Sequence, residues 1–284
     1  MTMYEELLAS AREELDEFSR QTQIFENLFT WGDFQQRCYT YMYWNNLRKT
    51  APPVETLRRE IPELGRMCRK CADFYIPARG KSVPRYDLVL GQHLEAALLK
   101  FLREKLGVET GRADTEDPRM PDCKVIKRDG SAAAYFEVKF HAAPFVNCYR
   151  FTGRYCYEGS VTLDYKKVGR QLQLIDQGLD APVYYVHWLE YPCLKGVFYE
   201  RSEQVRARIQ RNSAAFARKR REGDNMKMRE NVYLEKIYSP LLEMGNLEGF
   251  LQELERLIEG WEPVSAIAER RLILISNKTI PFCT

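Results

Sequence analysis

Two carboxylates and a lysine stand on either side of a strong turn signal in the middle of the chain. Asp122 precedes the pair Asp129-Gly130, and Glu137 and Lys139 follow it. Asp-Gly between short apolar runs is typical of a tight β-hairpin. If Asp129 and Gly130 are the two central turn residues, all directly opposed pairs have residue numbers with the same sum, and Asp122 and Glu137 form such a pair. The pattern predicts Asp122 opposite Glu137, with Cβ atoms roughly 5 Å apart, and Lys139 on the same face.

Two carboxylates this close repel each other, and one of them takes up a proton unless a cation lies between them. Oxygen ligands favour Mg²⁺, which keeps several waters and accepts one or two carboxylates from a protein. Bound Mg²⁺ polarises a phosphate and lowers the pKa of a water, and a neighbouring lysine can orient that water or offset developing charge. The residues therefore predict phosphodiester hydrolysis. The alternative is an exposed face with a Glu–Lys pair and no function.

The elements that must position these residues begin near residue 86. Leucines at every fourth position from Leu90 to Leu106 predict a helix that stops at Gly107. After the hairpin come a helical pattern from Val168 to Leu179, a β-rich run from Val183 to Trp188 and a short strand from Gly196 to Tyr199. This order predicts an α/β (α+β) fold with a mixed central β-sheet flanked by helices.

The regions on either side of this core, which spans residues 81–200, are expected to be mainly helical. Residues 1–80 contain amphipathic patterns and are interpreted as a helical accessory region. Residues 201–284 are expected to pack on the core, with an amphipathic helix at 247–261 and an edge strand at 272–275. Eight basic residues between Arg201 and Arg221 accompany one acidic residue, Glu203. A helix so charged suits a phosphate backbone, and a solvated face is the alternative.

The order Pro121-Asp122, hairpin and Glu137-Val138-Lys139 resembles the motif of the PD-(D/E)xK nucleases, the restriction-endonuclease-like superfamily. The resemblance covers about residues 86–200 and implies a mixed sheet with the active site at one edge of the hairpin. It implies that Asp122, Glu137 and the backbone carbonyl of Val138 hold Mg²⁺, and that Lys139 is catalytic. Many members carry a Glu on the preceding helix, so Glu95 is a further candidate metal ligand and catalytic residue.

Polar residues on the helix after the hairpin complete the candidate site. Lys167 and Gln171, one turn apart, match polar positions that many superfamily members carry there. Gln171 is assigned to catalysis, and Lys167 and Arg170 to nucleic-acid binding, although exposed helix faces are commonly polar. From the basic helix, the candidate nucleic-acid-binding residues are Arg206, Arg211, Arg218 and Lys219. Mg²⁺ is the expected cofactor, and Mn²⁺ is expected to substitute for it.

The predicted activity is that of a DNA endonuclease, such as a restriction enzyme or a related defence or mobile-element nuclease. A homodimer would explain double-strand cutting at a symmetric site. One alternative is a structure-specific or RNA-directed nuclease of the same fold, and another is a nucleic-acid-binding protein that keeps the fold without activity. A third is that the motif is accidental and the chain is a helical scaffold.

Composition narrows the setting in which this chemistry would operate. The net charge is only +3, so the distribution of charge rather than its total indicates nucleic acid. The sequence has no apolar run near the ~18 residues of a membrane helix, and its acidic start differs from a signal peptide, which predicts a cytoplasmic protein without a membrane partner. Eight cysteines are too few for a disulfide scaffold. Cys68 and Cys71 supply only half of a zinc or iron–sulfur pattern.

Overall fold

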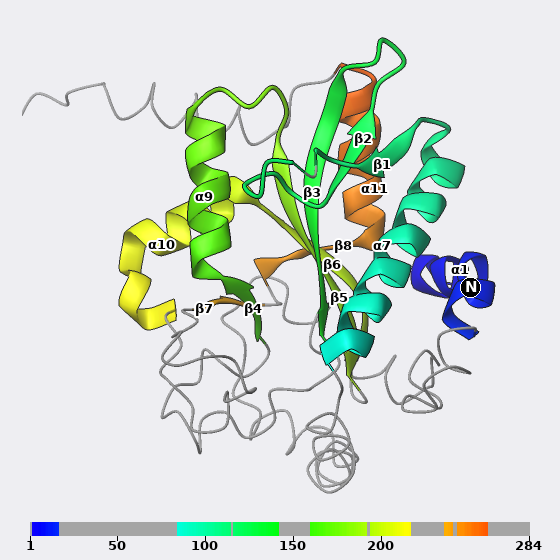
Figure 1. Ribbon diagram of the computed structural model, residues 1–284, viewed down its shortest axis with the longest axis horizontal. Helices are drawn as coiled ribbons and strands as arrows, with labels where there is room; N and C mark the ends of the chain where they lie inside the picture. The colour runs from blue at the N-terminus through cyan, green and yellow to red at the C-terminus, as the bar shows by residue number, and fades with distance from the viewer. Residues whose placement is uncertain are drawn as a thin grey trace, which may run out of the picture.

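A six-stranded mixed sheet forms the centre of the fold, with helices on both faces (Figure 1). In the order in which they lie, its strands are β1 (Thr110–Arg112), β2 (Cys123–Ile126), β3 (Ala132–His141), β5 (Val183–Tyr191), β6 (Leu194–Arg201) and β8 (Gly245–Asn246). Strands β3 and β5 pair in parallel, and the other neighbours pair antiparallel. The computed structural model describes residues 2–16, 84–114, 116–141, 160–191, 194–216, 236–240 and 243–260. The predicted fold class is confirmed.

Helices cover the two faces of this sheet in separate groups (Figure 1). On one face lie α1 (Met3–Ser10), α7 (Pro84–Leu106) and α11 (Leu247–Ile258), which share a large apolar core with β3, β5 and β6. On the other face lie α9 (Tyr165–Asp176), α10 (Ser202–Phe216) and a two-stranded sheet of β4 (Ser160–Asp164) and β7 (Lys236–Pro240). Because β5 is covered on both faces, its sequence is a nearly continuous apolar run rather than an alternating one.

The alternation of β3 decides which face carries the candidate site. Phe136 and Val138 belong to the large core under α7 and α11. Successive side chains of a strand point to opposite faces, so Glu137 and Lys139 point toward α9. Phe136 and Val138 of β3 thus pack into the core, whereas Glu137 and Lys139 face α9, the helix that follows the hairpin.

The first helix is part of this same core. Helix α1 begins with a capping box in which Thr2 and Glu5 bond each other's backbone N–H groups. Tyr4 packs edge-on against Trp188 of the central strand β5, and the Trp188 Nε1–H donates to the Tyr4 hydroxyl at 3.3 Å. The rest of the predicted accessory region, and its boundary at residue 80, lies outside the described residues and stays a prediction.

The hairpin has the predicted register beside the site, but its turn differs from the predicted one. The paired residues are Cys123 with Phe136, Lys124 with Tyr135, Val125 with Ala134 and Ile126 with Ala132. The first three pairs have the predicted register, which places Asp122, one residue before β2, across from Glu137. The fourth pair is shifted by one residue, because β3 contains a β-bulge at Ala133.

The expected two-residue turn is wrong, and the loop has three residues, Arg128 to Gly130. The Lys127 N–H donates to the Ser131 carbonyl at 2.8 Å, and the Gly130 N–H donates to the Lys127 carbonyl at 3.0 Å. Gly130 has φ 87°, a left-handed conformation that follows a type I turn in three-residue hairpins and favours glycine. The longer loop shifts the pairing by one residue, and the bulge shifts it back before the strands reach the site.

Several predicted features fall outside the described residues. They are Arg218, Lys219, the Cys68 and Cys71 pair and the edge strand at 272–275. Within the part of the chain that the structure describes, no helix combines the length and the apolar character that crossing a membrane requires.

Candidate active site

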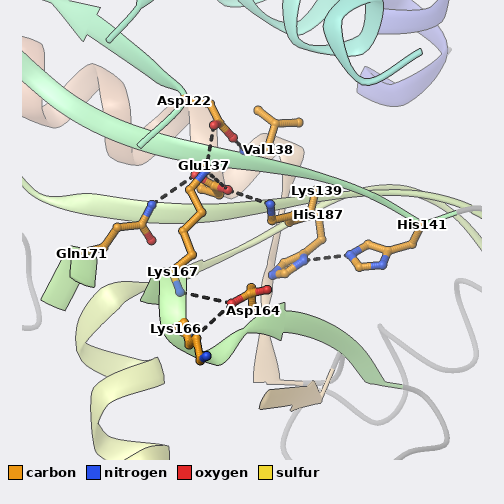
Figure 2. A network of polar contacts seen from close by, with 10 residues as sticks. All are labelled: Asp122, Glu137, Val138, Lys139, His141, Asp164, Lys166, Lys167, Gln171 and His187. Carbon is orange, nitrogen blue, oxygen red and sulfur yellow. Dashed lines mark hydrogen bonds and ion pairs between the residues drawn. The ribbon is translucent and has the colours of Figure 1, made fainter. Parts of the chain in front are cut away.

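Asp122 and Glu137 lie on the same side of the sheet and share one ammonium group. The Lys167 Nζ atom is 2.9 Å from Asp122 Oδ1 and 2.6 Å from Glu137 Oε1 (Figure 2). Lys139 Nζ approaches Glu137 Oε1 from the other side, at 2.7 Å. The structure therefore brings together Asp122, Glu137 and Lys139 as the hairpin predicts, and it adds Lys167 between the carboxylates.

Local structure explains why these side chains meet. The Val138 N–H donates to Asp122 Oδ2 at 3.3 Å, so the residue before β2 is held against β3. Helix α9 starts at Tyr165, and its N-cap Asp164 accepts from the backbone N–H groups of Lys166 and Lys167. Lys167 and Gln171 are four residues apart on this helix and therefore share a face, which is the face turned toward Glu137.

Glu137 is the buried centre of the cluster, with only 1% of its surface exposed. The Gln171 Nε2–H group donates to Glu137 Oε2 at 3.1 Å, which fixes both the carboxylate and the orientation of the amide. This contact supports the selection of Gln171 from the sequence as a member of the site. Because the amide nitrogen of Gln171 faces Glu137, the amide oxygen of Gln171 points away from that carboxylate.

The oxygen atoms of this cluster suit a hard cation. Within the described part of the chain, Gln171 Oε1 is buried without a hydrogen-bond donor, whereas Glu137 Oε1 has the ammonium groups of Lys139 and Lys167 as its partners. Two carboxylates and further oxygens form the donor set that Mg²⁺ prefers. Among the described residues, no three His, Cys, Asp or Glu side chains stand close enough to hold a metal together. A metal here would therefore rest on Asp122, Glu137 and backbone or water oxygens.

The charges of the cluster are strongly coupled. Burial lowers the pKa of Lys167, but the negative charges of Glu137 and Asp122 outweigh burial and raise that pKa above its ordinary value. The two carboxylates thus hold Lys167 firmly as an ammonium ion. The charge repulsion expected for close carboxylates is relieved in this structure by lysine.

Glu95 approaches the cluster from α7. Its carboxylate pairs with Arg112 of β1 at 3.2 Å. Glu95 is therefore anchored to β1 and not to the lysines between Asp122 and Glu137. Burial raises the pKa of Glu95, and the negative charge of Asp122 raises it further. The charges of the site therefore influence the pKa of Glu95, although its ion pair is with Arg112 and not with Lys167. Its role as a metal ligand stays a prediction.

Replacing Glu95 by Gln is expected to stabilise the metal-free protein slightly at neutral pH. A carboxyl whose pKa is raised in the folded state prefers its neutral form there, so its charged form opposes folding. The gain should shrink as the pH falls through the raised pKa, because the wild-type carboxyl then takes up a proton. Thermal unfolding in EDTA at several pH values measures this difference. Glu109→Gln, at an exposed position, is the control, and a lower midpoint for Glu95→Gln at neutral pH would contradict the expectation.

A cleft of about 490 Å³ opens beside the carboxylates. Its walls come from the loop before β2, from β3, from β4 and from the first turns of α9. Among the residues that the structure describes, those that line it are Pro118, Lys139, Phe140, His141, Thr162, Asp164, Lys166, Lys167 and Arg170. Four of these are lysine or arginine and one is acidic; Lys139 and Lys167 pair with the carboxylates, and Lys166 and Arg170 add further positive charge, which favours anions. Lys139 and Lys167 belong both to the cleft and to the carboxylate cluster.

The predicted basic helix corresponds to α10 in its described part, and its arginines include both buried and exposed residues. Arg206 pairs with Asp176 of α9 at 2.8 Å, and Arg208 is buried and pairs with Glu200 at 2.9 Å. Arg201, just before α10, pairs with Glu253 of α11 at 2.8 Å. These three residues hold elements together. Arg211 is exposed, and nucleic-acid binding by Arg206 and Arg211 stays a prediction.

Two contacts of the site were not predicted from the sequence. Lys167 was expected to contact nucleic acid, yet it stands between the carboxylates; the signal was its spacing of four residues from Gln171. His141, a cleft residue, bonds His187 of the neighbouring strand. The only sequence signal for this contact is that each histidine lies near the end of a predicted strand.

Comparisons with known proteins add little. No family model matches the chain, and no curated protein matches it. Among solved structures, the chain is similar to a nuclease from a fusselovirus, at 13% sequence identity over 63% of this chain and 94% of that chain, with a TM-score of 0.36.

Proposed function

We propose that this chain is a Mg²⁺-dependent endonuclease that hydrolyses phosphodiester bonds in DNA. The observation that supports this most is the buried carboxylate of Glu137, which shares the Lys167 ammonium group with Asp122. The two carboxylates lie beside a cleft whose lining includes lysine and arginine residues. A phosphodiester substrate needs both halves of this arrangement. The cationic cleft attracts its backbone, and the oxygen cluster suits the metal that hydrolysis requires.

The roles of the chain's residues follow from their contacts. Asp122, Glu137 and the Val138 carbonyl would hold Mg²⁺. Glu95, which pairs with Arg112 in this structure, is a further candidate ligand that would have to turn toward them. When bound, Mg²⁺ polarises a phosphate oxygen and lowers the pKa of a coordinated water. Gln171 keeps Glu137 oriented through its amide N–H. The resemblance of Pro121-Asp122 and Glu137-Val138-Lys139 to the PD-(D/E)xK motif agrees with these roles.

The two lysines have different tasks. Lys139 remains beside Glu137 on the same strand, where its charge can orient a water or offset negative charge that develops on the phosphate. Lys167 balances the carboxylates in the absence of a divalent cation, and it also lines the cleft. Its long side chain can therefore move its ammonium group from the carboxylates to a phosphate of the substrate. Lys166 and Arg170, at the cleft wall, supply further phosphate contacts.

Removing the metal is expected to abolish cleavage. We expect plasmid DNA to be cut in Mg²⁺, to stay intact in EDTA and to be cut again in Mn²⁺. Single-stranded DNA and RNA assayed in parallel show whether the enzyme is structure-specific or RNA-directed instead. A parallel Lys139→Ala preparation should be inactive, which excludes a contaminating nuclease. Undiminished cleavage in EDTA would contradict the proposal, and binding without cleavage of any substrate would identify a non-catalytic nucleic-acid-binding protein.

A further inference from the structure

Lys167 occupies the position between the two carboxylates that a bridging divalent cation would need. Its ammonium nitrogen lies 2.9 Å from Asp122 Oδ1 and 2.6 Å from Glu137 Oε1, and Figure 2 shows its side chain reaching from α9 to this point. Lys139 pairs with Glu137 from β3 and does not bridge the two carboxylates in the described part of the chain. Lys167 is therefore the group with which a bridging cation competes.

All four carboxylate oxygens of Asp122 and Glu137 already have partners within the chain. Besides the two oxygens that Lys167 contacts, Asp122 Oδ2 accepts from the Val138 N–H at 3.3 Å, and Glu137 Oε2 accepts from the Gln171 amide at 3.1 Å. The first of these donors belongs to the backbone of β3 and the second to a buried side chain, so neither can leave without a change in the fold. The lysine can leave by rotation about the bonds of its flexible side chain.

The cleft provides a place for the displaced side chain. Lys167 is 30% exposed, and it lines the cleft together with Lys166 and Arg170. If its ammonium group withdraws from the carboxylates, it enters a region that is already positively charged, where like charges repel one another. A bound phosphate removes this repulsion, so an anion in the cleft favours the withdrawn position.

The charges around the carboxylates show why this exchange matters. Among the described residues, the three carboxylates of the region are paired with three basic groups; the carboxylates are Asp122, Glu137 and Glu95, and the basic groups are Lys139, Lys167 and Arg112. Acidic and basic groups are thus balanced, and the region has little net negative charge to attract a divalent cation. Withdrawal of Lys167 restores a negative charge at the oxygens that would bind it.

We propose that Lys167 is an exchangeable cation of the site, which a divalent metal ion displaces from Asp122 and Glu137 and which a phosphate of the DNA then receives. The proposal rests on the proposed nuclease function and adds a coupling between its two ligands. Without DNA, Lys167 lowers the affinity for the metal ion. DNA raises that affinity because it holds the displaced ammonium group, and the metal ion must strengthen DNA binding by the same factor.

The first test measures Mg²⁺ binding to the full-length protein without DNA, by calorimetry. Lys167→Met keeps the length of the side chain and removes the competing charge. The matched control Lys166→Met removes the same charge at the exposed neighbouring position. We expect Lys167→Met to bind Mg²⁺ about tenfold more tightly than wild type, within the usual range of coupling between two sites, and severalfold more tightly than Lys166→Met. Equal affinities of the two variants would overturn the proposal.

The second test measures the coupling to DNA. Fluorescence anisotropy of a labelled duplex is compared in EDTA and in Ca²⁺, a hard cation that also takes oxygen ligands, and gels of the same samples show that the duplex is intact. We expect Ca²⁺ to strengthen DNA binding by wild type about tenfold. Lys166→Met should keep this gain at a lower overall affinity, and Lys167→Met should lose much of it. Gains of equal size in wild type and Lys167→Met would contradict the exchange.

A third measurement uses wild type alone and does not depend on the stability of a variant. Acetylation of the lysines, located by mass spectrometry, should be faster at Lys167 in Mg²⁺ than in EDTA and unchanged at Lys166. Labelling of Lys167 that does not increase in Mg²⁺ would overturn the proposal. If wild type still cuts DNA in Mg²⁺ when these results fail, the nuclease proposal stands. If wild type and Lys167→Met do not bind Mg²⁺ and DNA stays uncut, both proposals are removed.

Discussion

Replacing Glu137 by Gln is expected to lower the rate of DNA cleavage roughly a thousandfold, since the metal site loses a charged oxygen ligand that contributes several kcal/mol to the reaction. The substitution keeps the size of the side chain, which is buried against Gln171 and Lys167. DNA binding should survive in EDTA and become somewhat tighter, because one negative charge near the phosphate is removed. Gel assays of cleavage and calorimetric titration with Mg²⁺ measure the two effects.

Asp122→Asn should behave in the same way, whereas Lys139→Ala should separate metal binding from catalysis. A lysine ammonium cannot be a metal ligand, so the Lys139→Ala variant should lose cleavage and retain most of its affinity for Mg²⁺. Glu109→Gln, at an exposed position just before β1, serves as the matched carboxylate control and should cleave normally. Cleavage by Glu137→Gln or Lys139→Ala at near wild-type rates would refute the assigned mechanism.

Replacing Arg208 by Ala is expected to destabilise the protein by about 3–5 kcal/mol, a large part of the roughly 5–15 kcal/mol by which domains are usually stable. Arg208 is buried and contacts Glu200, Glu243 and Ser239. Its removal leaves the charge of Glu200 in the interior without its cationic partner. Urea unfolding followed by circular dichroism measures the loss.

Arg206, two residues earlier on α10, is the matched control for Arg208. Its partner Asp176 is 60% exposed, so Arg206→Ala should cost at most about 1 kcal/mol. The double variant Arg208→Met with Glu200→Leu removes both buried charges and should recover part of the stability that Arg208→Ala loses. If Arg208→Ala were no less stable than Arg206→Ala, the pair would not stabilise the fold.

The pH dependence of this network has a defined sign. The pKa of Glu200 is lowered in the folded protein despite its burial. A carboxyl with a lowered pKa contributes stability above its unfolded pKa, and that contribution disappears as the pH falls through the folded value. The difference in stability between wild type and Arg208→Ala should therefore narrow in acid.

The hairpin illustrates how far the sequence alone could predict the site. The Asp-Gly signal, the strands around it and the facing positions of Asp122 and Glu137 could all be predicted from short-range rules. The three-residue loop and the bulge at Ala133 could not, because Ala132, Ala133 and Ala134 have similar side chains and give no sign of which one is extra. Their effects on the pairing cancel, so the predicted register is correct beside the site although the turn is not.

The contacts of the arginines and histidines could not be predicted from the sequence. Counting basic residues between Arg201 and Arg221 could not tell which arginines point inward, since their acidic partners lie on other elements: Asp176 on α9, Glu200 on β6 and Glu253 on α11. His141 and His187 are likewise far apart in the sequence, and they meet because β3 and β5 pair in parallel across a helical connection. Contacts of this kind depend on the register of strands that no local pattern specifies.

The bulge at Ala133 has a practical meaning for protein engineering. Beside the site, β2 and β3 pair regularly from Cys123 to Val125, and the bulge separates this stretch from the turn, where Arg128, Asp129 and Gly130 are exposed. The tip of the hairpin is therefore a suitable insertion point for a fluorophore or an affinity tag. A probe placed there would move with the strands that carry Asp122 and Glu137.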